Sequence, residues 1–230
     1  MPAPLKTIEP RRLYQQVADQ IRQLIYRGRF EAGTRLPSER DLAQQLGVSR
    51  PSLREALIAL EIDGTVEIRM GSGVYVCPER ERPPLPTGLV GESPSELMQA
   101  RAIVEGSAAL MATARMTPET LSILRQSIDA MRIEIEQGRK ALDQDRLFHM
   151  TIARQTGNTV IARFIGELFD ERHSPIGEKL QTWFESRETW SLALAEHEAI
   201  YAAFEARDPL LAQSAMHAHL ESSKRRWTEA

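Results

Sequence analysis

The stretch from Pro37 to Leu57 constrains the fold of this chain most strongly. Ser38 is suited to cap a helix, and Gly47 is suited to end that helix after about two turns in the left-handed conformation. Ser49 can then cap a second helix, whose first turn tolerates Pro51. Apolar residues of the second helix recur at i, i+3, i+4 and i+7 and predict one buried face: Leu53, Ala56, Leu57 and Leu60. The pattern predicts two short helices joined by a tight turn.

Two arginines lie beside this predicted buried face. Arg50 and Arg54 are four residues apart at the start of the second helix, about a quarter-turn from the apolar stripe. Such an arrangement is a helix-turn-helix, whose second helix enters the DNA major groove by its N-terminal end. The alternative is an ordinary helical hairpin with solvated arginines, because this geometry is not unique to DNA-binding proteins.

The residues that follow favour the DNA-binding alternative. Two short runs rich in β-branched residues, 66–69 and 74–76, flank the glycine-containing segment 70–73. This pattern predicts a β-hairpin. A helix-turn-helix followed by a hairpin is a winged helix.

Residues 10–77 resemble the GntR family of bacterial transcription regulators. The resemblance is carried by the following segments: Glu31–Ala43, Gly47–Arg50, Leu53–Leu57, Leu60–Gly64 and Gly71–Val76. It implies a regulator, in our leading interpretation a repressor, that binds double-stranded operator DNA as a homodimer. The residues expected at the DNA are Arg35, Arg40, Ser49, Arg50, Ser52, Arg54, Gly71 and Gly73. The glycines would place the wing tip at the minor groove.

The distribution of charge agrees with this division of labour. The whole chain carries a net charge of −3 and has a pI of about 6.0, so it is not a basic coat for nucleic acid. Residues 1–82 contain 13 Lys and Arg against 11 Asp and Glu (+2), whereas residues 83–230 contain 16 against 21 (−5). Because the positive surplus is small, affinity for DNA must come from placed arginines and from two copies of the domain.

The cellular context can be estimated from the same sequence. Cys77 is the only cysteine, which excludes an intrachain disulfide and suits a reducing cytoplasm. No signal peptide is visible, and the longest apolar stretch, near residues 108–114, is too short to span a bilayer. We therefore expect a cytoplasmic protein without a membrane partner.

The fold class expected is mostly α. A winged helix-turn-helix domain is predicted over residues 1–78, and its first ten residues are expected to form a flexible arm. A proline-rich linker is predicted over 79–92. Residues 93–230 show helical patterns without a strand signal and predict an antiparallel bundle of about seven helices. The expected helices are 93–115, 117–138, 141–156, 159–172, 176–185, 187–207 and 208–227.

Four residues of the predicted bundle could hold a metal ion. Asp145 and His149 are four apart, so they project from one face of a helix, and His197 and His219 lie on two later helices. One carboxylate and three imidazoles suit a divalent ion of the Zn, Ni or Mn type and leave open positions for a ligand. The alternative is a surface Asp–His pair and solvated histidines.

Residues 94–226 resemble the ligand-binding FCD domain of the FadR subfamily. The resemblance is carried by these segments: Arg101–Glu105, Asp145–Ala153 with Gly157-Asn158, Glu196–Ile200, Ala206–Pro209 and Ala215–Leu220. It implies that Asp145, His149, His197 and His219 bind the metal, whereas His217 is a surface neighbour.

Arg101 matches a position of the FCD family that often meets an effector carboxylate, and a pair with Glu105 is the equal alternative. The segment Glu171–Pro175 resembles FCD regulators of hexuronate metabolism, and His173 within it is interpreted as a surface residue. These resemblances imply a small carboxylate as the effector, and a sugar acid is one candidate among the organic acids.

Three functions remain open from the sequence. The leading one is a ligand-controlled transcription regulator and not an enzyme. A metalloenzyme fused to a DNA-binding module is an alternative, because Asp and three His with open positions could activate water. A metal-free sensor, whose polar cluster binds the effector directly, is the third.

Overall fold

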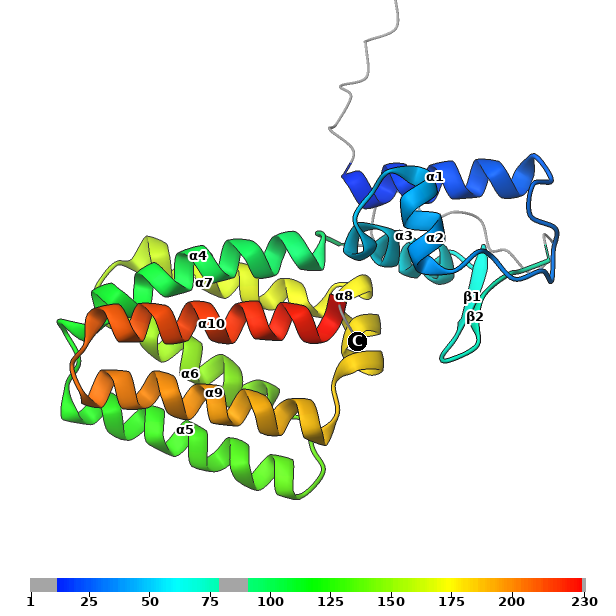
Figure 1. The fold of residues 1–230 in the computed structure, drawn as a ribbon. Helices are drawn as coiled ribbons and strands as arrows, with labels where there is room; N and C mark the ends of the chain where they lie inside the picture. The colour runs from blue at the N-terminus through cyan, green and yellow to red at the C-terminus, as the bar shows by residue number, and fades with distance from the viewer. Residues whose placement is uncertain (1–11, 79–90, 229–230) are drawn as a thin grey trace, which may run out of the picture. The chain divides into compact units, whose positions relative to one another are not determined.

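The computed structural model describes residues 12–78 and 91–228 (Figure 1). The chain divides into two units, residues 1–93 and 94–230. The predicted arm at the N-terminus and most of the predicted linker 79–92 lie outside the described residues. Within the described residues, no helix has both the length and the apolar character of a membrane span.

The described part of the first unit contains three helices and a two-stranded antiparallel sheet. These elements are α1 Leu13–Tyr26, α2 Glu39–Leu46, α3 Arg50–Ile62, β1 Val66–Arg69 and β2 Gly73–Val76. Helix α3 packs against α1 and α2 and buries the stripe predicted from its sequence. The winged helix-turn-helix expected from the sequence is therefore confirmed.

Local sequence signals set the ends of the two central helices. Ser38 accepts a hydrogen bond from the backbone N–H of Asp41 and caps α2, and Gly47 ends it with φ 67°. Ser49 accepts from the backbone N–H of Ser52 and caps α3. These caps satisfy backbone donors that a helix cannot satisfy by itself.

A third extended segment, residues 34–36, pairs with the wing, and the hairpin pattern does not predict it. The register of β1 and β2 pairs Val66 with Val76. On the other side of β2, the Leu36 N–H donates to the Val74 carbonyl at 2.8 Å, and the Val76 N–H donates to the Thr34 carbonyl at 3.0 Å. A single bridge pairs Arg35 with Tyr75. The segment before α2 thus holds the base of the wing.

The end of the predicted linker packs on the first unit. Tyr14 Oη donates to the Gly91 carbonyl at 2.8 Å, and Arg12 Nη1 donates to the same oxygen at 2.6 Å. Ser93 Oγ donates to Glu55 at 2.8 Å. Residues 91–93 are therefore tied to α1 and α3.

The second unit is all helical within the described residues. Its elements are α4 Pro94–Thr113, α5 Pro118–Glu136, α6 Leu142–Gln155, α7 Thr159–Asp170, the 3₁₀ turn η2 Glu171–His173, α8 Pro175–Phe184, α9 Arg187–Glu205 and α10 Pro209–Thr228. Seven α-helices match the number expected from the sequence. The helix predicted over 159–172 ends earlier as an α-helix, because Pro175 forces Ser174 into an extended conformation and the turn before it tightens.

Helix α6 occupies the interior of this bundle (Figure 1). It packs against α4, α5 and α7, while α10 lies along α4 and α9. Phe148 of α6 is fully buried, together with Leu124, Ile200 and Phe204 from neighbouring helices. Polar residues on the other faces of α6 are consequently carried into the interior too.

Candidate functional site

The residues expected at the DNA differ in their exposure. Arg40, at the start of α2, and Arg50, at the start of α3, are exposed. Arg54 is 8% exposed, and its guanidinium donates to Glu39 Oε2 at 2.9 and 3.2 Å. Arg54 therefore ties α3 to α2, and it can contact a base only by leaving or sharing Glu39.

The remaining expected DNA residues lie around the cap of α3 and at the wing. Ser49 is exposed and bonded to Ser52, which is half-buried. Arg35 is exposed and crosses Gly73 so closely that a Cβ added there would lie 2.4 Å from Arg35 Nε. The exposed Arg35 side chain could move aside, but φ 126° at Gly73 is a backbone conformation that favours glycine. Gly71 is exposed at the tip.

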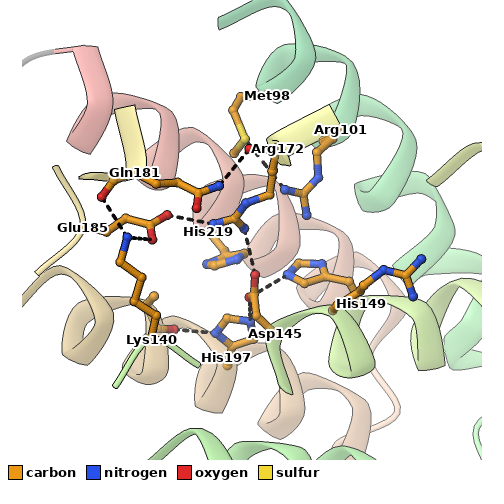
Figure 2. Close-up of polar contacts among 12 residues, drawn as sticks. Met98, Arg101, Lys140, Asp145, His149, Arg172, Gln181, Glu185, His197 and His219 are labelled. Atoms are coloured by element: carbon orange, nitrogen blue, oxygen red, sulfur yellow. Dashed lines mark hydrogen bonds and ion pairs between the residues drawn. The ribbon is translucent and has the colours of Figure 1, made fainter. Parts of the chain in front are cut away.

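Asp145, His149, His197 and His219, here called the Asp–His cluster, meet in the interior of the second unit (Figure 2). All four side chains are buried, and each offers one ligand atom within 4.8 Å of the others. Asp145 Oδ1 lies 3.1 Å from His197 Nε2 and 3.5 Å from His149 Nε2. The alternative of a surface pair with solvated histidines is therefore wrong, since the structure buries them together.

Each histidine of the cluster is oriented by a contact of its Nδ1 atom. His149 Nδ1 lies 2.5 Å from Glu105 Oε2, His219 Nδ1 lies 2.8 Å from a carboxylate oxygen of Glu196, and His197 Nδ1 lies 2.7 Å from the Ala193 carbonyl. Acceptors at Nδ1 place the proton there and leave Nε2 as a lone-pair donor. The Nε2 atoms of His149 and His197 are buried and have no hydrogen-bond partner among the residues that the structure describes. A divalent cation fits this donor set.

Three arginines anchor the groups behind the cluster. Arg101 Nε donates to Glu105 at 2.6 Å, and Arg226 donates to Glu196 at 2.7 and 3.0 Å. Arg172 Nη1 donates to Asp145 Oδ2 at 2.9 Å, the oxygen that does not face the imidazoles. Sequence reasoning foresaw only the Arg101–Glu105 pair, from its i, i+4 spacing; Glu196, Arg226 and Arg172 gave no signal for these roles.

Electrostatics favour a cation among these side chains. Burial raises the pKa of Asp145, but the imidazoles of His149 and His197 and the Arg172 guanidinium, all close to this carboxylate, outweigh that effect and hold the pKa well below its usual value. Burial also raises the pKa of Glu105, and Arg101 and His149 lower it to about 2. Burial and the neighbouring His197 lower the pKa of His219 to about 3. Near pH 7 the carboxylates are charged and His219 is neutral, as metal ligands must be.

A cavity opens beside the cluster. Its empty volume is about 430 Å³, a figure that includes space open to solvent. Asp145, His149 and His219 line it, and so do Arg101 and Arg172. His197 lies behind these residues and is fully buried. His217 and His173 are exposed, as expected from the sequence.

Comparison with known proteins relates both units to described families. Residues 13–76 match the family of bacterial regulatory proteins named gntR, and residues 96–222 match the FCD domain. The Exu regulon transcriptional regulator of Escherichia coli K12 is 34% identical over 227 residues, covering 96% of this chain and 86% of the relative. The Uxu operon transcriptional regulator of the same strain is 34% identical over 228 residues, covering 95% and 88%.

A further relative and two solved structures extend the comparison. The HTH-type transcriptional repressor NanR of Klebsiella aerogenes is 29% identical over 232 residues, covering 94% of this chain and 86% of the relative. The structure of Streptococcus agalactiae GntR has a TM-score of 0.50 at 27% identity, covering 92% of this chain and 99% of that one. The structure of E. coli McbR/YncC, at 20% identity and a TM-score of 0.51, covers 93% and 96% and supports the fold.

Proposed function

The chain belongs to the GntR family of bacterial transcription regulators and carries an FCD domain, and on this premise we propose that it is a metal-dependent repressor released from its operator by a small carboxylate. The observation that carries the metal-dependent part is the buried Asp–His cluster, with two imidazole Nε2 atoms that have no partner in the described residues. The name of the NanR relative supports repression over activation.

The cation would be held by Asp145, His149, His197 and His219. When bound, it would act as a Lewis acid for an oxygen of an anionic ligand. The protein's own part is to keep the Nε2 atoms aimed at one point through their Nδ1 contacts and to present one oxygen of Asp145. The relatives named above are transcription regulators, which favours sensing over catalysis at this site.

The effector in this proposal is a carboxylate, with a sugar acid favoured. The relatives named for the Exu regulon and the Uxu operon support this class, together with the resemblance of Glu171–Pro175 to regulators of hexuronate metabolism. Arg101 lines the cavity while paired with Glu105, so the two roles weighed for it from the sequence are compatible. Its guanidinium would bind the effector carboxylate beside the metal.

The operator would be read by the first unit. Arg50 and Arg54 would reach base edges from the start of α3, with Ser49 and Ser52 beside them, and Arg40 would meet the DNA from α2. Arg35 and the glycines of the wing, Gly71 and Gly73, would follow the minor groove. The exposure of Arg40 and Arg50 supports this assignment.

Two copies of the chain would bind one operator. Helices α4 and α7 pack against each other and expose apolar side chains: Ile103 is 62% exposed, Val160 62% and Phe164 44%. Exposed apolar side chains on neighbouring helices support a second copy of the chain as the occupant of this face.

The test is an operator-binding titration with metal-loaded and chelator-treated protein. We expect a shifted DNA band that a carboxylate effector reverses only when the metal is present. Elemental analysis of protein purified without chelators should give one divalent ion per chain. Blank elemental analysis combined with unchanged effector response after chelation would favour the metal-free sensor instead.

A further inference from the structure

Two arginines on the cavity wall each have one buried nitrogen that finds no hydrogen-bond acceptor among the described residues. These groups are Nη2 of Arg101 and Nε of Arg172. The two side chains are 2% and 10% exposed. Buried donors of a charged group are normally bonded, and an unbonded pair at one cavity indicates a ligand that supplies acceptors.

The two guanidinium groups are held at the same aromatic ring. Arg101 Cζ lies 4.6 Å and Arg172 Cζ 5.2 Å from the ring centroid of Phe169. Both arginines line the cavity that Asp145 and His219 also line, and Figure 2 shows both reaching toward the cluster. Both arginines therefore border the same space as the metal site.

The partners already present do not use up the donors. Arg101 is paired with Glu105, and Arg172 is paired with Asp145 and with Glu185 at 2.9 Å. A cation bound by the cluster would add positive charge beside these guanidinium groups, and an anion would offset it. Two N–H groups from separate arginines match the two oxygens of a carboxylate.

We propose that Arg101 and Arg172 form a clamp that binds one carboxylate group of the effector, with Arg172 Nε as its second donor. This inference rests on the proposed carboxylate response and adds a residue, Arg172, that determines which ligands are accepted. A neutral amide of the same shape offers one uncharged acceptor and would turn its own NH₂ group toward the second donor, so it would bind more weakly.

The backbone around Arg172 is fixed before any ligand arrives. Gln181 Nε2 donates to the Arg172 carbonyl oxygen at 2.9 Å. That oxygen also approaches Gly177 so closely that a Cβ added there would lie 2.5 Å away. Arg172 Cζ lies 5.6 Å from the ring centroid of Trp227. A donor fixed in this way loses little freedom on binding, which favours affinity.

The experiment compares charged and neutral ligands by calorimetry on zinc-saturated protein. The probes are D-glucuronate and L-lactate, with D-glucuronamide as the neutral analogue of the first. The variants are Arg172→Gln and Arg172→Lys. The control is Arg163→Gln, which removes the same charge from an exposed arginine paired with Glu167 on α7.

Arg172→Gln should weaken binding of the carboxylate by about 10- to 100-fold, as expected for loss of a charge-assisted hydrogen bond. Arg172→Lys, which keeps the charge but loses Nε, should weaken it less, and Arg163→Gln should bind as wild type does. Glucuronamide binding should be weak and equal in all four proteins. Zinc affinity and the melting curve, measured in parallel, identify a variant that has lost its metal or its fold. If Arg172→Gln has lost either, the affinity of Arg172→Lys for the carboxylate tests the clamp.

Two results would overturn the clamp. In the first, folded and zinc-loaded Arg172→Gln binds the carboxylate within twofold of wild type, or loses as much affinity for the amide as for the carboxylate. Arg172 then does not bind the carboxylate, while the proposed carboxylate response stands. If wild-type protein binds neither carboxylate, the proposed response fails, and the clamp fails with it.

Discussion

Replacing His219 by alanine should remove the thermal response of the protein to metal. His219 is 4% exposed on α10, and its ring centroid lies 4.5 Å from that of His197 and 5.3 Å from that of His149. His217 lies on the same helix two residues away, is exposed and offers no atom to the cluster. His217→Ala is therefore a matched control with the same chemical change.

The expected magnitude follows from mass action. A ligand present at about 100 times its dissociation constant stabilises the folded state by about 2.7 kcal/mol. For a helical unit of this size that corresponds to a rise in Tm of roughly 10 °C. If loss of one of four ligands weakens binding by about 100-fold, the same metal concentration only equals the new constant, and the gain falls to about 0.4 kcal/mol.

The assay is a melt followed by circular dichroism at 222 nm, with and without added zinc or nickel. We expect a large shift for wild type and His217→Ala and a shift of roughly 1–2 °C for His219→Ala. Because His219→Ala also opens a small cavity, each variant is compared with its own metal-free melt. The placement of the site would be refuted if metal raised the Tm of His219→Ala as much as that of wild type, or if metal did not raise the Tm of His217→Ala.

Three further predictions concern the DNA, the pH and the assembly. Arg54→Ala should weaken operator binding by about 1–3 kcal/mol in a gel-shift titration, and an unchanged affinity would contradict its role at a base. Burial lowers the pKa of His149, but Glu105 and Asp145 outweigh that effect and raise it. In the metal-free protein, the ion pair of protonated His149 with Glu105 therefore stabilises the fold fully below about pH 6.5, and this contribution is lost as the pH rises through the raised pKa. Since a metal ion must displace the proton on His149, the metal-induced shift in Tm should be larger at pH 8 than at pH 6. A larger shift at pH 6 would count against His149 as a metal ligand. Phe164→Asp should convert a dimer to a species of 26.0 kDa in light scattering, and wild type that is already monomeric with and without DNA excludes the proposed interface.

The helical elements could be predicted largely from the sequence because their signals are local. Ser38, Gly47 and Ser49 act on backbone groups within a few residues, and they set the same helix ends in the structure. Pro118 and Pro209 likewise begin helices where the sequence suggested. The spacing of Asp145 and His149 placed both on one face of a helix, whatever that helix packs against.

Contacts between distant segments could not be predicted in the same way. Arg54 lies four residues after Arg50, a spacing that fits two base-contacting residues on one helix face. Only the packing of α3 on α2 pairs Arg54 with Glu39. The bridge between Arg35 and Tyr75 joins segments whose local patterns are unrelated. Each of these contacts depends on how whole elements pack, which periodicity does not describe.

The candidate metal centre separates the two sources of information most clearly. The sequence by itself determined the residue types and put Asp145 and His149 one turn apart, since an α-helix fixes that spacing. The tertiary structure decided that α9 and α10 bring His197 and His219 within 4.8 Å of that pair, and that Arg172, on a 3₁₀ turn, reaches Asp145. Burial and the charged neighbours that packing brings together shift the pKa values of these groups, and both are properties of the packed fold.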